Sequence, residues 1–187
     1  MTSHRPTRLF VRLACLALVG VMGCASQAEI EPIEGARSLS RAERLATIGI
    51  AQGLLHEADV LEGLGQRGEA TLRAERVLTL ELAGDDPLRE PLRLDAHGRL
   101  AELALADGRL DDADAAIDRG LAEVHARSYF EARLHLVRGR VLEARAAVHR
   151  EAGHESEAQA ALRAALEAHE RSIAINEGLL RAEEDAP

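Results

Sequence analysis

Residues 94–121 constrain the fold more than any other stretch, because they read as two amphipathic helices joined by a tight turn at residues 107–109. Small and apolar residues recur in the first helix at steps of three and four, which places them on one helical face. They are Leu94, Gly98, Ala101 and Leu105. Gly108 suits the left-handed conformation that commonly ends a helix. The second helix presents Ala113, Ala116, Ile117, Gly120 and Leu121 on one side. This stretch is a helical hairpin that cannot bury its apolar face alone.

The turn of this hairpin has two looser copies along the chain. Gly65, Gly108 and Gly153 each precede an alanine by five residues, namely Ala70, Ala113 and Ala158. The alanines are 43 and 45 residues apart, and each opens a second helix. Regular spacing of such a motif indicates an internal repeat. The sequence therefore predicts three hairpins.

Four further helices are expected around the central hairpin. The first follows a capping box formed by Ser40 and Glu43 and runs to about Gly63, and the others span about 69–82, 128–151 and 155–183. The central hairpin's first helix starts near Pro87 with a distorted turn, or only around Pro91. The residues expected on buried faces are Leu45, Ile48, Leu55, Ala58 and Leu61 or Val60, then Leu72, Val77, Leu78 and Leu80, then Phe130, Leu134, Val137, Val141, Ala144 and Val148, and finally Ala158, Ala161, Leu162, Ala165, Leu166, Ile173 and Leu180.

Composition agrees with an all-α fold and argues against nucleic-acid binding. Aromatic residues make up 2% of the chain, so the core has to be packed from Leu, Ala, Val and Ile. The formal net charge is −9, and every basic side chain other than histidine is an arginine. Without residues 1–23, which carry three arginines and no acid, 20 arginines face 32 carboxylates. An acidic domain of this kind repels nucleic acid and anionic lipid.

The N-terminus reads as an export signal. Arg5, Arg8 and Arg12 precede an apolar run at about 13–22, which is too short to span a membrane and has the length of a signal-peptide core. Residues 21–24, Val-Met-Gly-Cys, resemble the bacterial lipobox. An ordinary cleavage site with an incidental cysteine is the alternative. We expect a signal peptide at 1–23, a lipidated tether at 24–38, a helical domain at 39–183 and a disordered tail at 184–187.

The lipobox resemblance implies that Cys24 carries diacylglyceryl and N-acyl (palmitate-type) chains and becomes the new N-terminus. Ala25 follows Cys24 at the position where an aspartate would retain a lipoprotein in the inner membrane of many diderm bacteria. The expected location is therefore the cell envelope, at the outer membrane and facing the periplasm. With Cys24 blocked by lipid, the mature chain has no free thiol for a disulfide or a thiol enzyme.

The turn motif G-[RHQ]-x-x-[DE]-A resembles the tetratricopeptide repeat. The best match lies in the central hairpin, at Leu100, Ala101, Ala104, Gly108, Ala113, Ile117, Gly120 and Leu121. His97, Ala104 and Ile117 fill the family's aromatic positions, and the repeat is longer than the standard ~34 residues. The resemblance implies a right-handed α-solenoid of three hairpins, with the last long helix as a cap. An up-down bundle is the alternative.

Candidate chemistry is sparse. His149 and His154, with Glu151 and Glu155 nearby, straddle a helix end, but their five-residue step is poor for a metal site. Glu131, His135 and Arg138 form an ordinary charged row, and His56 with Asp59 and His97 are read similarly. No phosphate loop, serine elbow or H-E-x-x-H motif occurs. We therefore expect no catalytic residues, no metal site and no cofactor beyond the lipid on Cys24.

Binding is the better expectation, because the first helices of a solenoid line a concave groove. On the family's register, the groove-facing residues are Gln52, Asp59, Glu62, Asp95, Glu102, Arg140 and Glu143. This set is mostly acidic and suggests a partner segment with basic character. The favoured hypothesis is a lipid-anchored adaptor for another envelope protein. The alternatives are a self-associating structural lipoprotein and, less favoured, an envelope enzyme or metal-binding protein.

Overall fold

The computed structural model describes residues 39–82 and 85–184, and over these residues it contains six α-helices and no strand. The predicted all-α class is confirmed. The chain divides into Met1–Arg37 and Ser38–Pro187, and only the second unit falls within the described residues. The predicted signal peptide, Cys24, the whole of the predicted tether (24–38) and residues 185–187 of the predicted tail lie outside the described residues.

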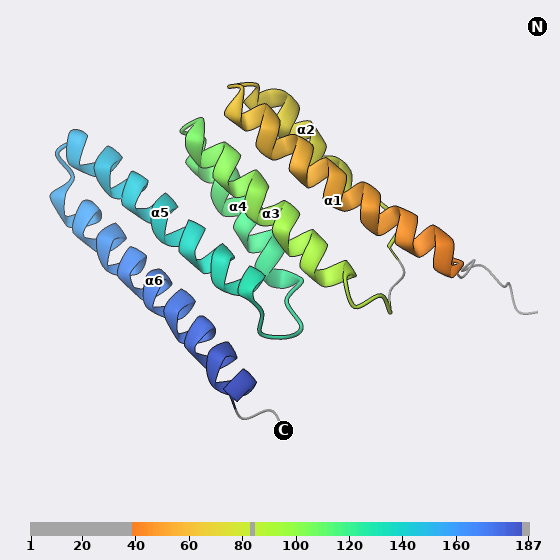
Figure 1. The fold of residues 1–187 in the computed structure, drawn as a ribbon. Helices are drawn as coiled ribbons and strands as arrows, with labels where there is room; N and C mark the ends of the chain where they lie inside the picture. The colour runs from red at the N-terminus through yellow and green to blue at the C-terminus, as the bar shows by residue number, and fades with distance from the viewer. Residues whose placement is uncertain (1–38, 83–84, 185–187) are drawn as a thin grey trace, which may run out of the picture. The chain divides into compact units, whose positions relative to one another are not determined.

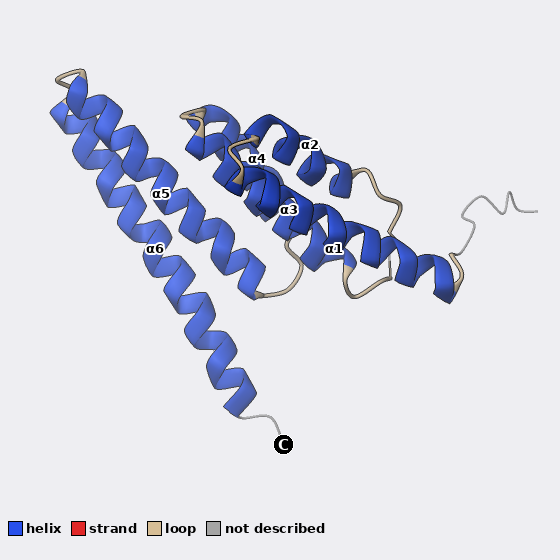
Figure 2. Ribbon diagram, turned by 45° about the horizontal axis from the view of Figure 1, so that its top comes forward, coloured by secondary structure: helices blue, strands red, loops and turns tan. Residues whose placement is uncertain are grey.

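The six helices form three consecutive pairs. They are α1 (Arg41–Gly63), α2 (Arg67–Leu78), α3 (Arg89–Ala106), α4 (Leu110–Ala122), α5 (Tyr129–Glu151) and α6 (Glu155–Glu184). Short turns join α1 to α2, α3 to α4 and α5 to α6, and the two helices of each pair pack together (Figures 1 and 2). Helix α3 contacts both α1 and α2, and α5 contacts both α3 and α4. Each new pair is therefore docked on the preceding one mainly through its first helix.

Local sequence signals explain where these helices begin and end. Ser40 and Glu43 form the predicted capping box, with the Glu43 amide donating to Ser40 Oγ at 3.2 Å. The turn glycines Gly65, Gly108 and Gly153 have φ values of 77°, 71° and 77°. This left-handed conformation strains any residue with a Cβ. The three copies of the turn motif therefore end three helices in the same way.

Two boundaries refine the sequence prediction. Helix α2 ends at Leu78 and not near residue 82, because Thr79 Oγ1 donates to the Arg76 carbonyl at 2.8 Å and closes the last turn. Helix α3 begins at Arg89, after Asp86 Oδ1 accepts from the Leu88 amide at 2.9 Å. Pro91 is tolerated because it lies in the first turn, where amides have no partner inside the helix.

The core consists of three apolar clusters that cross the boundaries between pairs. The largest joins the second and third pairs through Ile117 of α4 and Leu134 and Val141 of α5. Two smaller clusters join the first and second pairs: Val77 packs with Ala96 in one, and Ala70 packs with Leu103 in the other. These contacts bury the faces that a single hairpin leaves open.

Helix α6 packs differently from the sequence prediction. Among the described helices it contacts α5 alone, through a face that includes Ala158, Ala165, Ala168, Ser172 and Ile175. These mostly small residues let the two backbones approach closely, and a Cβ on Gly139 of α5 would collide with the His169 ring. The long side chains predicted to be buried on α6 are displaced to its flank and are exposed. They are Leu162, Leu166, Ile173 and Leu180.

Three other residues expected on buried faces are exposed, so the prediction is wrong for them as well. They are Leu45, Leu72 and Val148. Of the alternatives Leu61 and Val60, Leu61 packs against the core and Val60 is exposed. The predicted Ala58 is buried together with Ala70, because close packing between the first and second pairs selects small residues. None of the helices in the described part of the chain is long and apolar enough to cross a membrane.

Candidate functional site

Residues predicted to line the groove do come together on the side of the first helices. Arg99 of α3 bonds Glu62 of α1 at 2.8 Å, also pairs with Asp59 of α1, and lies 3.6 Å from Glu102 of its own helix. Its side chain is only 18% exposed. The side of α1, α3 and α5 that carries these groups is called the first-helix face below.

A second arginine continues the chain of ion pairs to the third hairpin. Arg133 of α5 bonds Glu102 at 2.6 Å and also pairs with Asp95 of α3. Arg140 lies further along α5, with its Nη1 4.0 Å from Glu102 Oε1. Arg99 and Arg133 thus connect the first helices of all three hairpins through carboxylates that the sequence prediction had assigned to a partner.

Burial changes the electrostatics of these pairs. It raises the pKa of Asp95 above its ordinary value, although the adjacent Arg133 acts to lower it. Burial also lowers the pKa of the Arg99 guanidinium. Because Asp95, Glu102 and Glu62 already bond arginines of the same chain, the first-helix face is less acidic toward a partner than its sequence suggests.

Glu143 and Gln52, the last two predicted groove residues, lie at opposite ends of the first-helix face. Glu143 Oε1 of α5 accepts a hydrogen bond from the His169 ring of α6, with His169 Nε2 at 3.0 Å, at the edge of the third hairpin. Gln52, Asp59 and Asp95 line one pocket of about 450 Å³ at the other end of the first-helix face. The structure therefore brings three of the seven predicted residues into one concavity.

The pocket lies between α1, the start of α3 and the start of α5. Its walls combine apolar side chains with the two carboxylates. The lining residues are Gln52, Leu55, His56, Asp59, Leu88, Pro91, Leu92, Asp95 and Phe130. A shallow apolar concavity with a few polar groups is the usual form of a binding site. We take this pocket as the candidate site and call it the groove pocket.

No family model, curated protein or solved structure matches this chain. Its function is therefore argued from the groove pocket and from the N-terminal sequence.

Sequence reasoning missed several residues of this face. Leu88, Pro91 and Phe130 line the groove pocket, yet the first two lie where the start of the helix was ambiguous. Phe130 packs against the largest core cluster as predicted, but its place at the groove pocket was not predicted. Arg99 and Arg133 were missed because their partners are 40 and 38 residues away in sequence.

A larger depression of about 530 Å³ lies between the turn after α3 and the end of α5. Its arginine, Arg145, bonds Asp111 at 2.6 Å and Asp114 at 2.7 Å. These pairs anchor α5 to the start of α4. We assign this depression to hairpin packing, because its charged groups are already paired across it.

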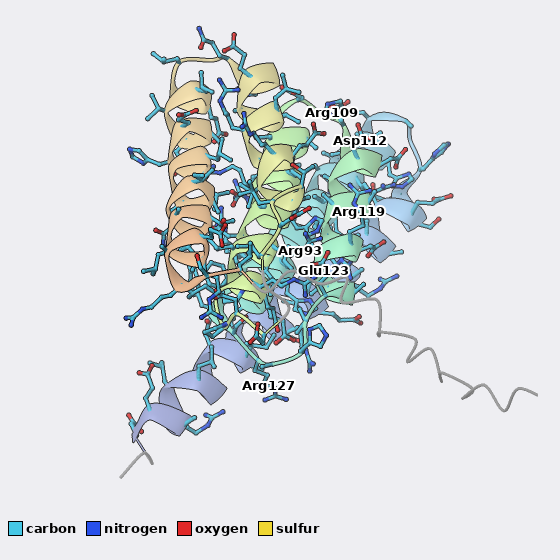
Figure 3. The ribbon with its side chains drawn as sticks, turned by 90° about the vertical axis from the view of Figure 1, so that its right-hand side faces the viewer. Arg93, Arg109, Asp112, Arg119, Glu123 and Arg127 are labelled. Atoms are coloured by element: carbon cyan, nitrogen blue, oxygen red, sulfur yellow. The ribbon has the colours of Figure 1, made fainter. Side chains whose placement is uncertain are left out.

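A partly buried polar cluster joins the end of α2, the first half of α3 and the end of α4, and Figure 3 labels two of its residues, Arg93 and Glu123. Arg93 bonds Glu123 through two contacts of 2.5 and 2.7 Å and donates to the Leu78 carbonyl at 2.9 Å. His97 Nε2 lies 3.4 Å from Glu123. The hydrogen bond from Arg93 lowers the pKa of Glu123, and burial lowers the pKa of His97. The cluster stabilises helix ends, and none of Arg93, His97 and Glu123 lines the groove pocket.

The candidate metal and relay residues do not form a reactive group. The His149 and His154 rings are 6.3 Å apart, and within the described residues no three or more His, Cys, Asp or Glu side chains gather as a metal site. Arg138 pairs with Asp118 of α4. Burial, followed by the charges of Arg138 and Arg171, lowers the pKa of His135. His56 lies at the groove pocket.

Proposed function

We propose that this chain is a lipid-anchored adaptor of the bacterial envelope that binds a segment of another envelope protein through the first-helix face. In this proposal the three hairpins form a right-handed tetratricopeptide-like solenoid. The support for that fold is the repeated glycine turn and the docking of each pair on the preceding one. The role is binding and not catalysis.

The groove pocket is the observation that carries the proposal. Leu55, Leu92 and Phe130 supply apolar contact, while Asp59 and Asp95 place carboxylates at the same concavity. Such a pocket fits an apolar side chain of a peptide, with neutral or basic neighbours along the peptide. Arg99 and Arg133 hold the pocket's carboxylates and the three first helices in place, so the surface is organised before a partner arrives.

The anchor rests on Cys24, outside the described residues. At ~0.8 kcal/mol for each buried CH₂, two or three acyl chains hold a protein firmly on a membrane. Residues 25–37 are polar and contain Pro32 and Gly35, which suits a short tether. An adaptor on such a tether samples partners in the layer next to the membrane, at the periplasmic face of the outer membrane.

The test is crosslinking of the full-length protein in its native host, followed by mass spectrometry of what copurifies. Gln52→Arg and Leu88→Glu alter the mouth of the groove pocket without breaking an ion pair, and each should remove at least about nine tenths of a specific crosslinked partner. Leu72→Glu, on an exposed side of α2, is the matched control. Cys24→Ser should release the protein from the membrane. Undiminished capture by both pocket variants would refute the groove assignment.

A further inference from the structure

Within residues 39–82 and 85–184, an apolar helix face is uncovered at both ends of the hairpin series. At the N-terminal end, Ile50 and Val60 of α1 and Leu64, the C-cap residue of α1, are at least half exposed, and Gly53 lies among them. At the C-terminal end, Leu162 and Leu166 of α6 are exposed. We call these two sets the α1 end face and the α6 end face. Repeat proteins usually carry polar terminal faces, so two apolar ends need an explanation.

The repeat spacing identifies which residues of the other hairpins are equivalent to those of the α1 end face. With the repeat spacings of 43 and 45 residues, Gly53 is the counterpart of Ala96 in α3 and Val141 in α5. Val60 is the counterpart of Leu103 in α3 and of the exposed Val148 in α5. Ala96, Leu103 and Val141 are fully buried against the preceding hairpin. Gly53 and Val60 therefore lie on the docking side of α1, and among the described helices no hairpin packs on that side.

The α6 end face is the other half of the same interface. Leu162 is the counterpart of Ile117 in α4, and Leu166 is the counterpart of Leu121 in α4 and Leu78 in α2. Ile117 is fully buried in the cluster that α4 shares with α5, and Leu121 and Leu78 pack against that cluster. On α6, no first helix from the described part of the chain packs on the equivalent side chains.

One chain thus carries both complementary halves of an interface that it already uses twice internally. We propose that the occupant is a second copy of this chain, stacked head to tail so that α1 of one copy packs on α6 of the next. The contact is heterologous, so it continues from copy to copy until a ring closes or a row ends. The inference rests on the hairpin repeat and uses no residue of the groove pocket.

The two end faces contain few charged side chains. The α1 end face contains no charged residue except Glu57 at its centre, and Glu57 bonds Arg73 of α2 at 2.7 Å. Leu162 and Leu166 are flanked by Arg163 and Glu167, which have opposite charges. The proposed contact is therefore mainly apolar, with the Glu57–Arg73 ion pair at the centre of its α1 half.

The experiment measures the mass of the fragment 38–187, which contains all three core clusters, by sedimentation over a range of concentrations. Its average mass should at least double as concentration rises. Ile50→Arg blocks the α1 end face and Leu166→Glu blocks the α6 end face, so each variant alone should remain a monomer. An equimolar mixture of the two should form dimers and nothing larger, because one intact end of each kind remains.

A control variant and three possible results separate head-to-tail stacking from other kinds of association. Leu72→Glu replaces a leucine with the same 59% exposure as Leu166, away from both end faces, and should associate like the unaltered fragment. An Ile50→Arg variant that still dimerises alone would indicate a symmetric α6–α6 contact and overturn the proposal. A fragment that stays monomeric at all concentrations would overturn it as well. In full-length protein in the membrane, a photo-crosslinker at position 166 should label α1 of another copy, and labelling of α6 alone would contradict the stacking.

Discussion

Gly120 of α4 lies directly against His97 of α3, with no room for a methyl group between them. A Cβ on Gly120 would be 2.9 Å from His97 Cβ and 2.9 Å from Leu134 Cδ1. His97 Cβ is attached to the backbone and cannot rotate away, and Leu134 is fully buried. The absence of a side chain at position 120 therefore sets how closely α3, α4 and α5 approach at this point.

Gly120→Ala should destabilise the domain. Overpacking a buried site costs about 1–3 kcal/mol, which exceeds the gain of roughly 0.5–1 kcal/mol that alanine brings to a helix. Chemical denaturation monitored by circular dichroism measures the difference. Gly49→Ala in α1 is the matched control, because nothing lies within 4 Å of a Cβ at that glycine and only the helical gain remains. A stabilised Gly120→Ala protein would contradict the close approach.

His97 makes the stability of the domain depend on pH. Burial lowers its pKa in the folded state below the ordinary value of about 6.5, so the unfolded chain takes up a proton first as the pH falls. The neutral His97 imidazole makes its full contribution to the free energy of unfolding above about pH 6.5. That contribution is lost as the pH falls toward the folded-state pKa. One such group changes the free energy of unfolding by up to about 1.4 kcal/mol for each pH unit.

His97→Gln should therefore flatten the dependence of stability on pH below about 6.5, as measured by urea denaturation at a series of pH values. The pKa of His135 is lowered in the same direction, chiefly by burial. His135→Gln should remove a further part of the slope, because the two residues titrate separately. An unchanged slope in the double variant would show that neither imidazole is kept neutral by the fold.

Local signals predicted most of the secondary structure correctly. The capping box at Ser40 and the glycine turns each act within a few residues, so their effect is readable in the sequence. Helix α2 was predicted too long because its apolar residues continue past Leu78 to Leu82, beyond the turn that Thr79 closes. Apolar character therefore marks a packed segment without marking where its helix ends.

Burial and pairing were harder to predict because they depend on which helix lies opposite. The leucines of α6 have the helical spacing of a buried stripe, but small residues such as Ala165 and Ala168 occupy the contact with α5. Asp95 and Glu102 were read as partner-facing because their arginine, Arg133, follows only in the next repeat. The spacing of apolar residues identifies one face of a helix. Which residues that face contacts depends on the helix that packs opposite it.

Arg133 should contribute more to stability than an exposed arginine in a similar ion pair. Its side chain is 19% exposed and holds Asp95 and Glu102. Arg133→Met therefore leaves the half-buried Asp95 without its arginine, and leaves Glu102 with only the longer contacts to Arg99 and Arg140. Loss of a hydrogen bond to a charged group costs about 1.5–3 kcal/mol. Arg73→Met removes an exposed pair with Glu57 and should cost at most about 1 kcal/mol. Denaturation of both variants measures the difference, and equal losses would show that Arg133 is not a structural link between the second and third hairpins.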